Sequence, residues 1–151
     1  MKPATRFKMY SASDLRAQVV AKWVAKNIPG CERGWDKCVT MEVARGDDII
    51  GGVVFHDYNP EAGTMCMSAA GGNGWLTRPV LHRMHSYVFC DAGCQLAVLQ
   101  VAEDNDRMLS IARRYGYQEH RIPRLRGRDK AEVILTLTDD DWLASRFHRR
   151  A

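Results

Sequence analysis

The sequence predicts an α/β protein in which one mixed sheet is flanked by helices. Three short β-type segments joined by polar turns predict antiparallel strands in the first half of the chain. In the second half, the apolar segment 96–102 leads through a polar crest into an amphipathic segment that stops at a glycine. The predicted order is helix, three antiparallel strands, helix, strand, helix, two strands, helix, and this order favours a layered sheet-and-helix architecture.

The first predicted helix follows Ser11 or Ser13, either of which can cap it. Its apolar stripe recurs at helical spacing and ends before Pro29-Gly30. The stripe consists of Leu15, Val19, Val20, Trp23, Val24 and Ile28.

Segments 38–44 and 49–56 then predict a hairpin, because both are rich in β-branched residues and a polar turn separates them. A second turn, 57–63, leads to a third strand over 64–70, and the glycines of 71–74 break the pattern.

A second helix is expected from Thr77 or Arg78, with Pro79 in its first turn, where a missing N–H costs nothing. The remaining elements follow in chain order. They are a strand over 95–102, a helix over 106–115, a strand from Tyr117, a basic loop over 121–130, a strand over 132–138 and a short helix capped by Thr138 or Asp139 that runs through Trp142.

Length and composition indicate one globular domain over residues 1–151. The chain is 46% hydrophobic and 26% charged, and no apolar run reaches the roughly 18 residues of a membrane span. The N-terminal residues lack an apolar signal core. Five cysteines without a paired CxxC spacing indicate buried thiols in a reducing, cytoplasmic compartment. A net charge of +4 suits an anionic ligand without requiring nucleic acid.

The most specific motif is Asn105 at the start of a helix that ends in Gly116-Tyr117. Glu119, Gly127-x-Asp129 and the run Trp75-Leu76-Thr77-Arg78 accompany it. With the order of elements over about residues 10–140, these residues resemble the GNAT superfamily of acyl-CoA-dependent N-acetyltransferases. Within it, they resemble the branch that acetylates protein N-termini or small amines.

The resemblance implies acetyl-CoA as co-substrate and a primary amine, on a protein N-terminus, a lysine or a small molecule, as acceptor. Residues 71–79 correspond to the pyrophosphate loop of relatives, at a helix N-terminus suited to anions. Asn73, Leu76 and Arg78 occupy the positions of its R/Q-x-x-G-x-G/A pattern. Because Leu76 and Arg78 cannot adopt glycine-only conformations, the loop is expected to be shaped differently.

The resemblance also assigns cofactor contacts along the chain. The strand over 64–70 would pair with the pantetheine arm through its main chain. Asn105 can cap its helix and also reach the arm. The predicted cofactor-binding residues are Met67, Ser68, Ala69, Trp75, Leu76, Thr77, Arg78 and Asn105.

Catalysis requires a base for the acceptor amine and an acid for the departing thiolate. Relatives often place a tyrosine seven residues after the asparagine, but that position is Ala112 here, and Tyr115 comes three residues later. Water or Ser110 is therefore the candidate acid. The candidate bases are His56 and Glu103 near predicted strand ends and Glu42 within a strand, and each of these can equally be structural.

The alternative is a non-catalytic CoA-binding, protein-binding or nucleic-acid-binding module on the same fold. The basic loop RIPRLRGRDK carries five cations, but no RNA-binding aromatic motif interleaves with it. No standard zinc spacing occurs among His82, His85, Cys90 and Cys94, so no metal is expected. Trp35 and Tyr58 are candidates to line the acceptor site, and a homodimer is left open.

Overall fold

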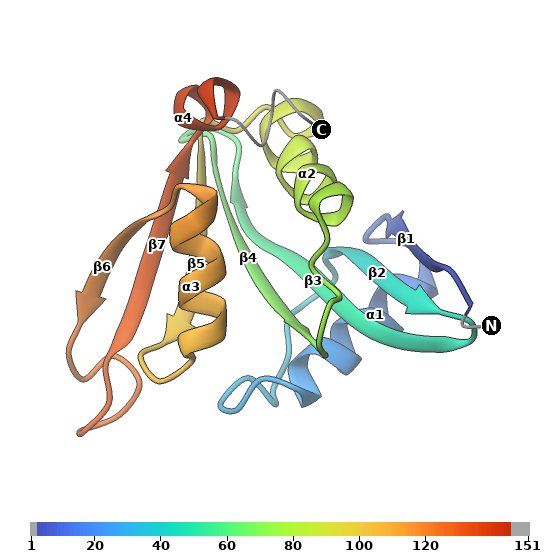
Figure 1. Ribbon diagram of the computed structural model, residues 1–151, viewed down its shortest axis with the longest axis horizontal. Coiled ribbons are helices and arrows are strands. Elements are labelled where there is room, and N and C mark those ends of the chain that lie inside the picture. Colours follow the sequence, from blue (N-terminus) through green and yellow to red (C-terminus); the bar gives the residue numbers. More distant parts are fainter. Residues whose placement is uncertain (1–2, 146–151) are drawn as a thin grey trace. The chain divides into compact units, whose positions relative to one another are not determined.

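A computed structural model describes residues 3–145 (Figure 1). Seven strands form one mixed sheet in the order β1-β2-β3-β4-β5-β7-β6, and one neighbouring pair is parallel. The strands are β1 (Thr5–Tyr10), β2 (Val39–Arg45), β3 (Asp48–Asn59), β4 (Thr64–Gly71), β5 (Leu96–Ala102), β6 (Gln118–Ile122) and β7 (Glu132–Thr138). The predicted mixed α/β architecture is therefore confirmed.

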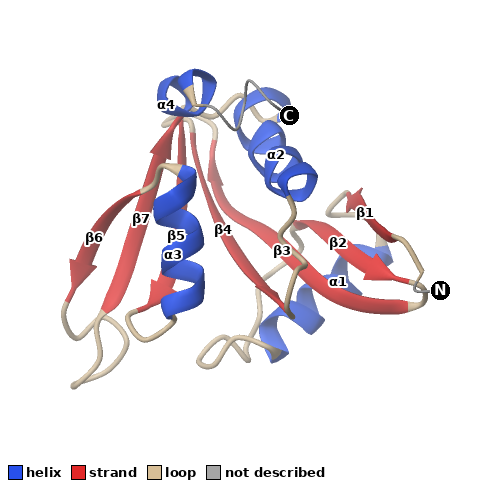
Figure 2. Ribbon diagram, in the orientation of Figure 1, coloured by secondary structure: helices blue, strands red, loops and turns tan. Residues whose placement is uncertain are grey.

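The helices follow the predicted order (Figure 2). They are α1 (Leu15–Lys26), α2 (Arg78–Ser86), α3 (Asp106–Tyr115) and α4 (Asp139–Ala144). A π-helical turn, η1 (Tyr87–Asp91), directly follows α2. Across the described residues 3–145, no helix is long and apolar enough to span a membrane.

The described chain divides into two compact units. The first contains residues 3–56 and 67–84, and the second contains 57–66 and 85–145. Strands β3 and β4 contribute residues to both units, whereas β1, β2 and α1 belong to the first and β5, β6, β7, α3 and α4 to the second. That residues 1–151 form a single domain stays a prediction.

In the first unit, α1 buries one face against the antiparallel strands β1, β2 and β3. Val20 and Val24 of α1 are fully buried and form a core with Val54 of β3. The Arg16 guanidinium donates to both carboxylate oxygens of the buried Glu42, at 2.7 and 3.0 Å. This bidentate ion pair fixes the first turn of α1 on β2.

Three local expectations for this unit were wrong. Strand β1 was not predicted, because it is an edge strand whose side chains are exposed or half-buried and therefore lack a core-facing pattern. The N-cap of α1 is Asp14, which accepts the Arg16 N–H, rather than Ser11 or Ser13. Strand β3 continues to Asn59, so the second turn is shorter than the predicted 57–63.

In the second unit, β5 and β6 both pair antiparallel with β7. Helix α3 begins after Asn105, whose side chain accepts the Met108 N–H, and ends at Gly116 with φ 114°, a conformation that favours glycine. Thr138 caps α4 through the Asp141 N–H. These three boundaries agree with the prediction, because capping is decided by neighbouring residues in the sequence.

A buried aromatic cluster forms the core of the second unit. His85 stacks on Tyr115 at 4.5 Å between ring centroids, and its Nε2 is hydrogen-bonded to the Tyr117 hydroxyl. Trp142 donates its indole N–H to the Tyr115 hydroxyl at 3.0 Å. Burial, assisted by Tyr115, raises the pKa of Tyr117 well above its ordinary value.

This raised pKa predicts a loss of stability in alkali. The unfolded chain releases the Tyr117 proton near pH 10, whereas the folded chain retains it. The stabilisation is thus complete below about pH 10 and is lost as pH rises towards the folded-state pKa. Urea unfolding from pH 8 to 11 should show this decline. In Tyr117→Phe the free energy of unfolding should fall less steeply with pH, whereas Tyr58→Phe, which changes a surface tyrosine, should behave like the wild type. An unchanged pH dependence in Tyr117→Phe would show that Tyr117 does not cause the decline.

Candidate active site

Ser68 lies in the middle of β4 and forms the centre of the candidate site. Met67 is buried, whereas Ser68 and Ala69 are half-buried. Neighbouring side chains of a strand point to opposite faces of the sheet, so Ser68 lies on the face opposite to Met67. The Ser68 hydroxyl is 2.8 Å from Nε2 of His56 on β3. A strand predicted to accept the pantetheine arm therefore carries a serine that is hydrogen-bonded to a candidate base.

Trp35 connects this pair to the segment after α1. Its indole stacks on the His56 ring, with 5.5 Å between centroids and 29° between planes. Both rings are half-buried. Tertiary structure thus brings together Trp35, His56 and Ser68, which the sequence analysis had named separately for acceptor, base and cofactor roles.

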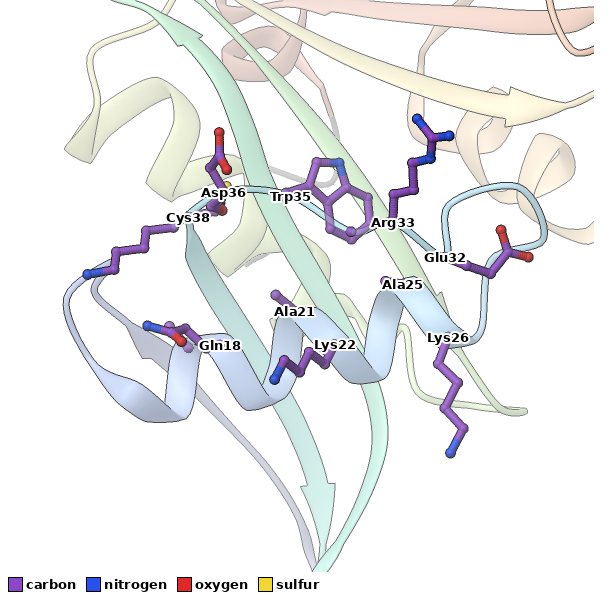
Figure 3. Close-up of a pocket in the computed structure, with 13 residues that line it drawn as sticks. Gln18, Ala21, Lys22, Ala25, Lys26, Glu32, Arg33, Trp35, Asp36 and Cys38 are labelled. Carbon is purple, nitrogen blue, oxygen red and sulfur yellow. Dashed lines mark hydrogen bonds between the residues drawn. The ribbon is translucent and has the colours of Figure 1, made fainter.

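A cavity of about 650 Å³ lies between α1 and the segment 32–38, and Trp35 forms part of its wall (Figure 3). Small residues at every fourth position of α1, Ala17, Ala21 and Ala25, leave room for it. The charged residues around it are Lys22, Lys26, Glu32, Arg33, Asp36 and Lys37. None of these charged residues was predicted to line a site, although the four-residue spacing of the alanines on α1 is visible in the sequence.

The buried side chain of Trp75 fixes the loop before α2 to the protein. The indole is 4% exposed and packs over Gly51 and Gly71, where a Cβ atom would collide with its ring. Its side chain therefore points into the protein, so any ligand contact by Trp75 would come from its backbone. Leu76 is half-buried, and Thr77 and Arg78 are exposed.

Thr77 caps α2. Its hydroxyl oxygen accepts the Val80 N–H at 3.4 Å, and Pro79 has no N–H to offer. The first turn therefore presents fewer backbone donors than a typical phosphate-binding helix N-terminus. The Thr77 hydroxyl hydrogen and the Arg78 guanidinium are the side-chain donors suited to a pyrophosphate here.

Asn105 is exposed, and its side-chain oxygen accepts the Met108 N–H at 3.2 Å. The helix-capping role is thus observed. Its amide nitrogen is a second, chemically distinct group, so capping and a contact with the pantetheine arm are compatible. The contact stays a prediction.

Among the candidate bases, the two glutamates have structural partners. Glu103 accepts the Ala131 N–H at 2.6 Å and the Arg121 guanidinium at 3.1 Å, and these bonds lower its pKa. Glu42 is paired with Arg16. A lowered pKa makes a carboxylate a weaker base, so His56 is the better candidate.

The candidate acids on α3 differ in environment. Ser110 is exposed, Ala112 is buried, and Tyr115 is buried with its hydroxyl accepting from Trp142. Burial raises the pKa of Tyr115. Tyr115 therefore belongs to the core of the second unit, and Ser110 stays the predicted side-chain acid.

The basic loop is largely internally neutralised. Arg121 pairs with Glu103, Arg126 with the buried Glu132, and Lys130 with Asp104. These pairs hold the segment against the ends of β5 and β7 and reduce its attraction for polyanions. Tyr58, the other predicted acceptor residue, lies in the second unit and donates to the Ala92 carbonyl.

The fold is that of the GNAT acetyltransferases. It matches spermidine N-acetyltransferase SpeG of Vibrio cholerae with a TM-score of 0.69 at 14% identity, covering 93% of this chain and 96% of that one. It also matches YncA of Salmonella typhimurium, solved with its cofactor acetyl-CoA, with a TM-score of 0.66 at 14% identity, covering 90% and 94%. No protein-family model and no curated protein matches the sequence.

Proposed function

We propose that the protein is an acetyl-CoA-dependent N-acetyltransferase that acts on a primary amine. The observation that supports this proposal is the Trp35–His56–Ser68 arrangement, in which His56, the candidate base, is hydrogen-bonded to the strand predicted to hold the pantetheine arm. The fold it shares with acetyltransferases, one of them solved with acetyl-CoA, supports the same conclusion.

In the proposed reaction, the acceptor nitrogen attacks the thioester carbonyl of acetyl-CoA. The C–N bond forms, the C–S bond breaks, and CoA leaves as a thiolate that takes up a proton from water or from Ser110. His56 accepts the proton that the amine loses. Holding both substrates in one orientation supplies much of the rate enhancement.

The remaining cofactor contacts of the proposal are those predicted from the sequence. Main-chain groups of Met67, Ser68 and Ala69 pair with the pantetheine amides, and Asn105 adds a side-chain contact. Thr77 and Arg78 bind the pyrophosphate, with Trp75 and Leu76 shaping the loop. We also propose a cytoplasmic location, because all five cysteines are free thiols. A homodimer is a further part of the proposal.

A non-catalytic CoA-binding module on the same fold is the second candidate. It is favoured by one observation, that the buried Ala112 stands where many relatives have a tyrosine acid. Such a protein would bind acetyl-CoA without consuming its thioester in the presence of any amine.

Calorimetric titration with acetyl-CoA, followed by an assay of thiol release with a panel of amines, tests the proposal. We expect binding, and release of CoA only when an acceptor amine is present. Thr77→Ala combined with Arg78→Ala should weaken binding of CoA more than binding of pantetheine, which lacks the pyrophosphate. The absence of both binding heat and a thermal shift at millimolar acetyl-CoA would contradict the proposal. If the double variant weakens CoA and pantetheine equally, Thr77 and Arg78 do not bind the pyrophosphate.

A further inference from the structure

The cavity between α1 and the segment 32–38 has a chemical bias that identifies a class of acceptor. Its floor is apolar, because Ala17, Ala21 and Ala25 lie along one face of α1. Its wall carries Trp35, whose ring contacts His56. A ligand in this cavity would therefore rest on small apolar groups and contact Trp35, the wall residue whose ring stacks on the candidate base.

The charges around the cavity are unequal. Two carboxylates are present, and four cations outnumber them: Lys22, Lys26, Arg33 and Lys37. Glu32 accepts the Gly30 N–H at 3.1 Å, and backbone hydrogen bonds lower its pKa, so both carboxylates count as full negative charges against the four cations. Since all six charged side chains are exposed, they act as a positive rim around an apolar floor.

This rim repels polycations and attracts carboxylates. A polyamine such as spermidine would bring several positive charges against a positive rim, which opposes binding. An amine that carries its own carboxylates would have those groups compensated by the rim lysines. The volume of about 650 Å³ suits an amino acid or the first residues of a peptide.

We propose that this cavity binds the acceptor, and that the acceptor is an amine bearing nearby carboxylates, such as an acidic amino acid or an acidic peptide N-terminus. The carboxylates contact the rim cations, Lys22 and Lys37 foremost, and the amine lies towards Trp35 and His56. This inference rests on the proposed function for its chemistry, but the binding it predicts is measurable without acetyl transfer.

The first experiment compares acceptors that differ only in charge. With acetyl-CoA present, kcat/KM should be higher for glutamate than for glutamine, and spermidine should be the poorest of the three. The ratio of glutamate to glutamine should fall as salt is raised. A peptide with two acidic N-terminal residues, compared with free glutamate, separates the two sources of such an acceptor.

Charge reversal locates the effect. Lys22→Glu combined with Lys37→Glu should lower the glutamate-to-glutamine ratio by about tenfold, because two attractive surface contacts become repulsive. Acetyl-CoA affinity should not change. Arg128→Glu, which reverses an exposed cation on the β6–β7 segment, should leave the ratio unaltered and serves as the matched control.

A binding measurement separates this inference from the proposed function. In the absence of acetyl-CoA, glutamate should shift the indole N–H resonance of Trp35 at lower concentration than glutamine does. If acetyl-CoA binds and turns over but glutamine or spermidine is preferred, the inference is overturned and the proposed function stands. If glutamate binds at Trp35 but acetyl-CoA does not bind, the proposed function fails and the anionic-ligand cavity remains.

Discussion

Gly71→Ala should destabilise the protein by about 1–3 kcal/mol and weaken acetyl-CoA binding at the same time. A Cβ atom at this position would overlap Cδ1 and Cγ of the Trp75 indole, which is a rigid ring rather than a flexible chain end. The ring or the strand end must move, and the loop that leads to Thr77 and Arg78 moves with Trp75. Gly51→Ala should behave similarly, because its Cβ would meet the same ring.

The adjacent Gly72 is the matched control. A Cβ there meets nothing within 4 Å, so Gly72→Ala should leave both stability and acetyl-CoA affinity nearly unchanged.

Trp75→Ala should lower the free energy of unfolding by about 3–5 kcal/mol, as truncation of a buried aromatic residue usually does. In that background Gly71→Ala should add little, because the clash no longer exists. Urea unfolding of the wild type, Gly71→Ala, Trp75→Ala and the double variant measures the free energies of unfolding. If the losses of the two single variants add up in the double variant, Gly71 and Trp75 do not pack as described.

His56→Ala should lower kcat by about 10²–10⁴, the usual contribution of a general base. Acetyl-CoA affinity should be retained, because the imidazole is assigned to the acceptor amine and not to the cofactor. Added imidazole should restore part of the activity by occupying the space beside Trp35. Ser68→Ala should have a smaller effect, since Ser68 orients the His56 ring through one hydrogen bond at 2.8 Å.

His120→Ala is the control for this test. His120 is an exposed histidine on β6, near Thr136 in the second unit, and its loss should leave kcat unchanged. Full activity in His56→Ala would show that His56 is not the base and that another group or water accepts the proton. A folded variant with a lost base will melt at the wild-type temperature and still bind acetyl-CoA. A variant that is inactive because it is unfolded will do neither.

The site was only partly predictable, for a physical reason visible in single residues. The resemblance to the GNAT superfamily assigned Asn105, Thr77 and Ser68 to the cofactor site. Their positions at a helix cap, after a turn and in a strand were predictable because these are local properties. Trp75 was named as a cofactor residue, but its indole is buried over Gly51 and Gly71. Packing of Trp75 against Gly51, 24 positions earlier in the chain, has no signature in the residues around either one.

The order and type of most elements were determined by the sequence, because hydrophobic period, glycine stops and caps act over a few neighbouring residues. Strand β1 escaped prediction because an edge strand is held by main-chain pairing with β2 and buries little. Only the tertiary structure brought Trp35 onto His56 and His56 onto Ser68, and only it opened the positively rimmed cavity beside α1. These features join residues far apart in the chain, and their geometry depends on how strands pair and helices pack rather than on any local pattern.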